Sequence, residues 1–176
     1  MAMWVFGYGS LLWNPGFAPR ERVVARLDGY HRSFCMRSVH YRGTAENPGL
    51  VLALDKAPGA HCAGLGLRVA EEDERAVLEA LRARELISAA YLEKWLPVTL
   101  ADGRRVDAVS YAIDPDHAQY CGRLGLEEQA RIIARASGGR GPNSAYLFNT
   151  VAHLSELGIE DAELDWLVTR VRQIMG

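Results

Sequence analysis

The chain has 176 residues, of which 49% are apolar and 24% charged, and its formal net charge at neutral pH is −2. This is the composition of a soluble globular protein of one domain, and it excludes disordered, collagen-like and coiled-coil chains. The slight acidic surplus argues against nucleic-acid binding and against a polybasic membrane-binding surface. No apolar run approaches the roughly 18 residues of a membrane span, and the first residues lack the basic region of a signal peptide.

The first half of the chain is predicted to form strands. Short apolar runs bounded by glycine or proline indicate them. The predicted strands are Trp4–Tyr8, Val23–Ser33, Leu50–Leu54, Cys62–Val69, Tyr91–Leu100 and Arg105–Ile113. The Asp102-Gly103 dipeptide predicts a hairpin turn between the last two. The spacing over Glu71–Glu85 is instead that of a helix, with acidic residues in its first turn.

Three further helices are predicted to end the chain. Glu127–Ser137 is stopped by Gly138-Gly139, which is typical of a glycine C-cap. Asn143–Leu157 and Asp161–Met175 follow, each with an apolar stripe. Strands first and helices last favour an α+β fold, and we expect a small mixed or antiparallel β-barrel flanked by helices, as a single domain over residues 1–176.

The glycine-rich segment from Gly7 to Leu12 matches none of the common nucleotide or hydrolase motifs. Leu12 stands where a dinucleotide fingerprint needs its third glycine, and the glycines of a nucleophile elbow are missing around Ser10. Two interpretations stay open. The segment is either a plain tight turn, or a turn whose backbone amides of Gly9, Ser10 and Leu11 face an anion or a developing oxyanion.

Metal and disulfide chemistry find no support in the sequence. The five histidines show neither an HExxH motif nor an i, i+4 pair, so no metal site is expected. Cys35, Cys62 and Cys121 are an odd number at wide spacing, which predicts neither a disulfide framework nor a zinc site. We therefore expect a reduced, cytoplasmic protein without a metal.

Glu85 is a carboxylate on an apolar helix face. Leu78, Leu81 and Glu85 are spaced i, i+3 and i+7, which places them on one side of the predicted helix. A buried carboxylate raises its pKa and can then carry protons near neutral pH. A lone proton carrier suits an intramolecular reaction, in which the substrate brings its own nucleophile. Alternatively, the helix ends earlier and Glu85 is solvated or paired with Arg82 or Arg84.

Four further candidates each have a plainer alternative. Arg42 could pair with a substrate carboxylate, although most arginines are solvated. Gly139–Asn143 could bind an anion at a helix N-terminus, although a glycine C-cap followed by an Asn143 N-cap explains the same residues. Tyr91 and Tyr146 could line a pocket or simply be core tyrosines with satisfied hydroxyls.

Four segments, in the same order, resemble the ChaC family of γ-glutamylcyclotransferases. They are Val5-Phe6-Gly7-Tyr8-Gly9-Ser10-Leu11-Leu12-Trp13, Arg42-Gly43 with Pro48-Gly49, Arg84-Glu85 with Tyr91, and Gly138–Asn143 with Tyr146-Leu147. The resemblance covers the chain from about Met3 onward. It implies a small mixed β-barrel with flanking helices, no metal or organic cofactor, and cleavage of glutathione to 5-oxoproline and cysteinylglycine.

The resemblance also implies roles for individual residues. Glu85 is the expected catalytic base, and Tyr8, Gly9, Ser10 and Leu11 are the expected substrate cradle. Arg42, Tyr91 and Tyr146 are further expected substrate contacts. The partner is therefore a small γ-glutamyl molecule, with no nucleic acid or membrane.

One segment departs from the family pattern. Leu86-Ile87-Ser88-Ala89-Ala90-Tyr91 stands where several members carry Gly-Gly-Tyr. Two other functions therefore stay open: cyclisation of other γ-glutamyl peptides or amines, and a non-catalytic binding module of the same fold linked to cation transport.

Overall fold

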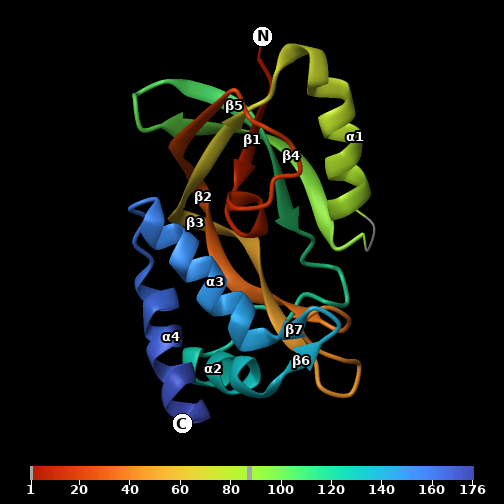
Figure 1. The fold of residues 1–176 in the computed structure, drawn as a ribbon, viewed down its shortest axis with the longest axis vertical. Helices are drawn as coiled ribbons and strands as arrows, with labels where there is room; N and C mark the ends of the chain where they lie inside the picture. The colour runs from red at the N-terminus through yellow and green to blue at the C-terminus, as the bar shows by residue number, and fades with distance from the viewer. Residues whose placement is uncertain (1, 87–88) are drawn as a thin grey trace. The chain divides into compact units, whose positions relative to one another are not determined.

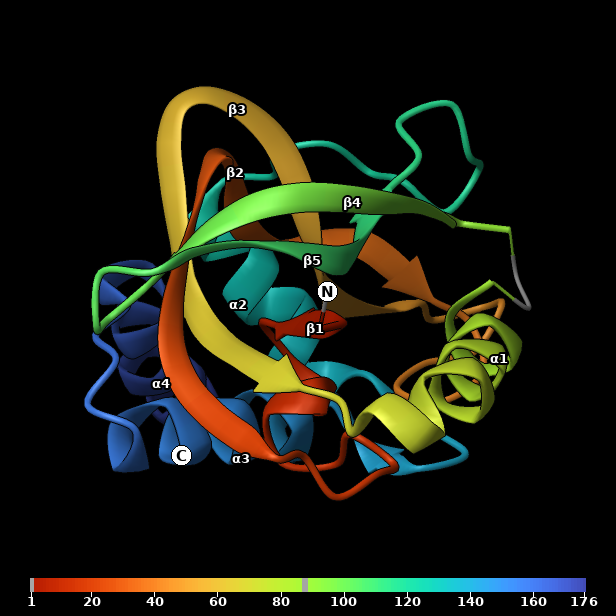
Figure 2. The same ribbon diagram turned by 90° about the horizontal axis from the view of Figure 1, so that it is seen from above.

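The computed structural model describes residues 2–86 and 89–176, and it contains a closed five-stranded β-barrel (Figure 2). The strands are β1 (Trp4–Gly7), β2 (Glu21–Ser38), β3 (Gly49–Arg68), β4 (Tyr91–Leu100) and β5 (Arg105–Ile113). Their order around the barrel is β1-β3-β2-β4-β5, and the parallel pair β1–β5 closes it. Since β1–β3, β2–β4 and β4–β5 are antiparallel, the barrel is mixed. The predicted α+β fold with a small mixed barrel is confirmed.

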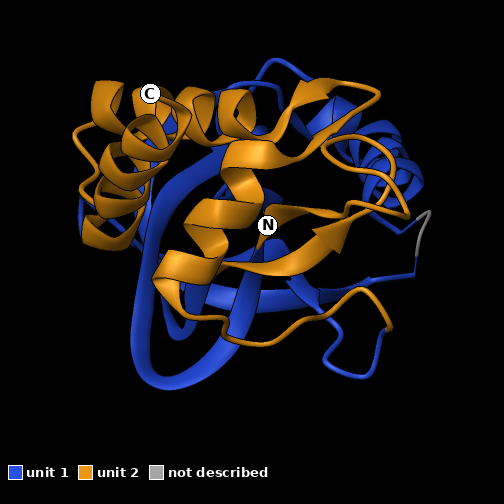
Figure 3. Ribbon diagram, turned by 90° about the horizontal axis from the view of Figure 1, so that it is seen from below, with its two compact units in different colours: residues 1–32, 53–117 blue, residues 33–52, 118–176 orange. Residues whose placement is uncertain are grey.

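The chain divides into two compact units (Figure 3). The barrel unit comprises residues 1–32 and 53–117, and the helical unit comprises residues 33–52 and 118–176. The long strands β2 and β3 each contribute residues to both units.

Strands β2 and β3 are longer than the sequence predicts, whereas β4 and β5 have the predicted bounds. Leu50–Leu54 and Cys62–Val69 were expected to be separate strands, but both belong to β3. The residues between them include Gly59, whose φ of +84° lets the strand bend without ending. Gly29 gives the paired strand β2 a similar bend, with φ +83°. The residues between the two predicted strands therefore form a bend within one strand.

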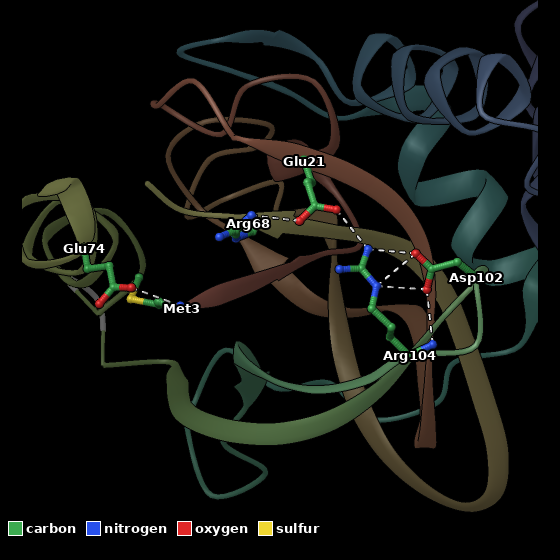
Figure 4. A network of polar contacts seen from close by, with 6 residues as sticks. All are labelled: Met3, Glu21, Arg68, Glu74, Asp102 and Arg104. Atoms are coloured by element: carbon green, nitrogen blue, oxygen red, sulfur yellow. Dashed lines mark hydrogen bonds and ion pairs between the residues drawn. The ribbon is translucent and has the colours of Figure 1, made fainter. Parts of the chain in front are cut away.

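The helix predicted from Glu71 begins with a short 3₁₀ turn, η2 (Glu71–Asp73), and continues as α1 (Glu74–Glu85). The Glu74 carboxylate accepts a hydrogen bond of 3.1 Å from the Met3 backbone N–H, which ties the helix to the start of β1 (Figure 4). Val77 and Leu81 are its buried residues.

A polar network holds the predicted β4–β5 hairpin to the rest of the barrel unit (Figure 4). The turn closes through the Gly103 N–H, 2.9 Å from the Leu100 carbonyl oxygen. Arg104 after the turn binds Asp102 at 2.7 Å and Glu21 at 2.9 Å, and Glu21 also accepts from Arg68. These pairs are largely exposed, so they position the hairpin more than they stabilise it.

Three helices pack side by side in the helical unit (Figure 1). They are α2 (Leu126–Arg135), α3 (Asn143–Glu156) and α4 (Ala162–Met175), and Asp161 caps α4 through the Leu164 N–H. No helix in residues 2–86 or 89–176 has both the length and the apolar character needed to cross a bilayer.

The predicted glycine C-cap of α2 is wrong. The helix ends at Arg135, and Ser137-Gly138 (β6) pairs with Gly141-Pro142 (β7) in a small hairpin. A Cβ on Gly138 would lie 2.6 Å from the backbone nitrogen of Gly43. This glycine therefore permits a close approach of two backbones and does not cap a helix.

Candidate active site

The Tyr8–Leu11 segment forms a tight turn at the end of β1. Ser10–Leu12 is a single 3₁₀ turn, η1, closed by the Leu12 and Asn14 N–H groups, which donate to the Gly9 and Ser10 carbonyls at 2.9 Å each. A Cβ on Gly7 would lie 3.3 Å from Leu11, so a larger residue there would crowd the turn. The backbone hydrogen bonds that close the turn are donated by Leu12, Trp13 and Asn14. Among the described residues, none of these bonds is donated by Gly9, Ser10 or Leu11.

A buried arginine that the sequence analysis missed supports this turn from β2. Arg32 is only 4% exposed, and its Nη1 donates to the Tyr8 carbonyl at 3.2 Å and to the Ala63 carbonyl at 2.8 Å. The backbone of Gly64 lies so close to Gly7 that a Cβ on Gly64 would collide with the Gly7 carbonyl oxygen. Arg32 and Gly64 together fix the path of the backbone into the turn. An arginine within an amphipathic strand is ordinarily solvated, so no sequence signal pointed to Arg32.

Glu85 is the last residue of α1, so the helix reaches it as predicted. Its side chain is 14% exposed, and burial raises the pKa of the Glu85 carboxyl above its ordinary value, while the cation of Arg84 opposes this effect. Of the alternatives, early termination of the helix is wrong. Pairing with Arg84 is confirmed at 3.5 Å, whereas Arg82 pairs with Glu93 instead.

Arg84 connects this carboxylate to the turn. Its Nε lies 3.5 Å from a Glu85 oxygen, while its Nη2 donates to the Ser10 hydroxyl at 2.8 Å and its Nη1 donates to the Asn14 carbonyl. One side chain therefore holds the end of α1 against the turn that follows β1. The structure brings the predicted base and the predicted Ser10 turn together, although they lie far apart in the sequence.

A second polar cluster anchors the last turn of α1 to the sheet. Arg82 forms two hydrogen bonds of 2.9 Å with Glu93 of β4, and the Tyr111 hydroxyl donates to the same carboxylate at 3.0 Å. Burial, the bond to Glu93 and the negative charges of Glu93 and Glu85 raise the pKa of Tyr111, which stays neutral. Glu85 is thus close enough to act electrostatically on Tyr111.

The connection after Glu85 contains a residue in an unusual conformation. Ile87 and Ser88 lie outside the described residues, but Ala89 has a φ of +57°. This left-handed conformation suits glycine far better than alanine. Ala89 belongs to the segment that departs from the Gly-Gly-Tyr pattern. Tyr91 follows as the first residue of β4, opposite Ile113.

Arg42 and Tyr146 come together in the helical unit. The Arg42 guanidinium carbon lies 5.6 Å from the centre of the Tyr146 ring, and its Nη1 donates to the Pro142 carbonyl at 3.2 Å. Burial lowers the pKa of Arg42, and the Arg140 cation acts in the same direction, while Tyr146 opposes it. The Leu52 N–H donates to the Tyr146 hydroxyl oxygen at 3.2 Å, which fixes the ring.

The glycines of the predicted motifs explain how Arg42 is placed. A Cβ on Gly43 would collide with the Gly49 nitrogen, and a Cβ on Gly49 would collide with the Arg42 carbonyl. With Gly138, which abuts Arg42 in the same way, they let three backbone segments pack in direct contact. Larger side chains at these positions would push Arg42 away from α3.

Asn143 does not cap α3, contrary to the plainer interpretation of its segment. Its side chain is fully buried, donates to the Leu50 carbonyl at 2.8 Å and accepts from the Leu50 N–H at 2.8 Å. The residue before it, Pro142, occupies the cap position. Asn143 thus acts as a clamp on the start of β3. Its oxygen and one of its two amide N–H groups are thus bound to Leu50.

Within residues 2–86 and 89–176, no group of three or more His, Cys, Asp or Glu side chains is arranged to hold a metal ion.

Comparison with known proteins identifies the family. The model of the family described as ChaC-like protein matches residues 3–174. The glutathione-specific gamma-glutamylcyclotransferase of Escherichia coli K12 is 39% identical over 174 residues, 99% of this chain and 74% of that protein. Gamma-glutamylcyclotransferase 2-3 of Arabidopsis thaliana is 36% identical over 182 residues, 100% of this chain and 92% of that protein. The crystal structure of a yeast gamma-glutamyl cyclotransferase specific to glutathione has the same fold, with a TM-score of 0.86 at 24% identity and full coverage of both chains. The chain belongs to the ChaC-like family.

Proposed function

We propose that this protein is a γ-glutamylcyclotransferase that cleaves glutathione to 5-oxoproline and cysteinylglycine. The observation that carries this proposal is the carboxyl of Glu85, which is mostly buried, has a raised pKa and is joined through Arg84 to the Ser10 turn. The names of the E. coli and yeast relatives support glutathione as the substrate.

Glu85 acts first as a base and then as an acid. Its carboxylate takes a proton from the α-amine of the γ-glutamyl unit, and the amine attacks the γ-carbonyl carbon of the same unit. A five-membered lactam closes, the amide bond to cysteine breaks, and the leaving nitrogen takes the proton back from Glu85. A raised carboxyl pKa suits this exchange because proton transfer is most efficient when the pKa of the group lies near the working pH.

The turn after β1 supplies the substrate cradle. In this scheme the backbone N–H groups of Gly9, Ser10 and Leu11 hold the glutamyl carboxylate or the oxyanion of the tetrahedral intermediate, and Tyr8 forms the wall beside them. Substrate contacts of Arg42, Tyr91 and Tyr146 stay predictions that rest on the family resemblance. Substitution of each should raise KM more than it lowers kcat.

The reaction needs no metal or organic cofactor in this scheme. The substrate supplies the nucleophile, closeness of the amine to its own carbonyl lowers the barrier, and the protein supplies the proton carrier. We further propose that residues 1–176 work as one domain in the cytoplasm. The family match over residues 3–174 supports the single domain, and the cysteine thiols suit a reducing compartment.

The test is product release from glutathione in the presence of a chelator. Wild-type protein should release 5-oxoproline and cysteinylglycine in equal amounts. Glu85→Gln keeps the shape of the side chain and removes the proton carrier, so its rate should fall by about 10²–10⁴. Glu79→Gln, on the exposed face of the same helix, is the matched control and should keep wild-type activity.

Two results would contradict the proposal. Near-wild-type turnover by Glu85→Gln would remove Glu85 from the mechanism. No product from folded wild-type protein would reject glutathione, and a panel of other γ-glutamyl peptides and amines would then separate another cyclotransferase from a non-catalytic binding module.

A further inference from the structure

Two cysteines that the proposed reaction does not use lie directly opposite each other in the helical unit. Met36 of β2 and Tyr120 form an antiparallel bridge, so the next pair in register is Cys35 and Cys121. The Cys121 N–H donates to the Cys35 carbonyl at 2.8 Å, and the Arg37 N–H donates to the Gln119 carbonyl at 2.7 Å, which fixes this register on both sides. Residues opposite each other on antiparallel strands project their side chains to the same face.

We propose that Cys35 and Cys121 are a redox modification site, at which a low-molecular-weight disulfide or a hydroperoxide converts the two thiols into a reversible intramolecular disulfide. The backbone geometry is suitable. Opposed residues of a hydrogen-bonded antiparallel pair have Cα atoms about 5.5 Å apart. Disulfides span Cα separations of about 4.4–6.8 Å, most often near 5.5–6 Å. The Cβ atoms of such a pair lie about 4.5–5.5 Å apart and those of a disulfide about 3.5–4.5 Å apart, so the bridge requires rotation of the side chains and a small approach of the two segments.

The unequal burial of the two thiols gives the order of the steps. Cys35 is fully buried, whereas Cys121 is partly exposed, so an external oxidant reaches Cys121 first. With glutathione disulfide, the Cys121 thiolate attacks one sulfur, forms a mixed disulfide and releases one glutathione thiolate. The Cys35 thiolate then attacks the Cys121 sulfur and releases the second. The protein loses two hydrogens, and glutathione disulfide becomes two molecules of glutathione.

The consequence lies in the segment that joins β5 to α2. Residues 119–121 have no regular secondary structure apart from the bridge. They are held by backbone hydrogen bonds to β2 and by the Gln119 side-chain amide, which donates to the Arg37 carbonyl at 3.0 Å. A disulfide would add a covalent link at this point. It would stabilise the helical unit when the thiol pool becomes oxidised, because it restricts the unfolded chain.

Cys62 provides the internal control. It is buried in β3 of the barrel unit, and its thiol contacts the Ala63 carbonyl at 3.8 Å. The register that pairs Cys35 with Cys121 does not include it. The proposal therefore predicts that oxidation of the folded protein consumes two thiols and leaves the Cys62 thiol.

The experiment uses the reduced full chain and glutathione disulfide as the probe. After incubation, the protein is unfolded, remaining thiols are alkylated, and intact mass and peptide mapping are recorded. Wild type should carry one alkyl group, on Cys62, and a linked peptide pair containing Cys35 and Cys121. The Cys62→Ala variant should carry none, and the Cys121→Ser variant should keep both of its thiols. Dithiothreitol should restore every thiol, and oxidation should raise the Tm of wild type but leave that of Cys121→Ser unchanged.

Each contrary result overturns the proposal. Three alkylated thiols after incubation show that the pair does not react. A stable glutathione adduct on Cys121 shows that Cys35 cannot resolve it. Cys121 is partly exposed, so Cys121→Ser keeps the test valid even if substitution of the buried Cys35 prevents folding. The readout is independent of the proposed enzymatic function, because mass and Tm require no turnover.

Discussion

The clamp formed by Asn143 offers a prediction whose size follows from its geometry. Asn143→Ala removes both hydrogen bonds to Leu50, and both residues are fully buried. An unsatisfied buried donor or acceptor costs about 1–3 kcal/mol, so the two together should lower the free energy of unfolding by roughly 2–6 kcal/mol. A chain of this size loses about 2–4 °C of Tm per kcal/mol, so the Tm should fall by roughly 4–24 °C.

Asn143→Asp separates the hydrogen bonds from packing. A carboxyl can satisfy both Leu50 groups only while protonated, because an ionised carboxylate accepts but cannot donate. The pKa of this buried carboxyl should therefore be raised in the folded state. A raised pKa contributes stability below the unfolded value, near 3.9, and loses it as the pH rises through the folded value. The variant should approach wild-type stability in acid and fall behind it toward neutral pH.

The assay is thermal unfolding followed by circular dichroism from about pH 3 to pH 8, a range that brackets the ordinary carboxyl pKa. Asn47→Asp is the matched control, because Asn47 is exposed in the same unit and should show no such pH dependence relative to wild type. A stability difference between Asn143→Asp and wild type that does not change with pH would refute the hydrogen-bond argument. If Asn143→Ala lowers the Tm no more than Asn47→Ala does, the magnitude assigned to the two hydrogen bonds with Leu50 is refuted.

Three further predictions concern the barrel unit. Glu85→Gln should raise the Tm near neutral pH, because the raised pKa of Glu85 means that ionising this carboxyl destabilises the fold. The gain in Tm should disappear in acid, and the same gain in Glu79→Gln would count against this explanation. Arg32→Met removes the donor to two carbonyls behind the Ser10 turn and should lower kcat/KM by about 10–10²-fold. Arg22→Met, at an exposed position of the same strand, should leave kcat/KM unchanged, and equal kcat/KM values for the two variants would show that Arg32 does not position the turn. Ala89→Gly should stabilise the protein by about 1 kcal/mol, because glycine adopts a positive φ without strain, and an unchanged or lower Tm in thermal unfolding would contradict this.

Local patterns predicted much of the fold and singled out one residue of the candidate site. Apolar runs located all five barrel strands, and the Asp102-Gly103 turn was found because its chemistry is local. Glu85 was recognised because a carboxylate interrupted an apolar helix face. The errors concern residues whose roles are set by distant neighbours: Gly138 admits another backbone, and Asn143 serves Leu50 instead of its own helix.

The arginines of the site illustrate the same limit. Arg84 could be noticed as a neighbour of Glu85, but its bond to Ser10 depends on how α1 meets the turn after β1. Arg32 gave no signal, since burial of its guanidinium against two carbonyls depends on how the turn after β1 and strand β3 lie relative to β2. Spacing along one element predicts which residues share a face, but it cannot predict which backbone groups from other elements will need a donor.

The division of the chain has a consequence for its biosynthesis. Neither unit is a continuous stretch of sequence: the barrel unit needs residues 1–32 and 53–117, and the helical unit needs residues 33–52 and 118–176. On the ribosome, residues 33–52 emerge long before the helices that complete their unit, so the end of β2 and the start of β3 must wait without their partners. No truncation at a single point yields one unit without part of the other. Completion of each unit therefore depends on contacts between segments far apart in the sequence, and such contacts slow folding.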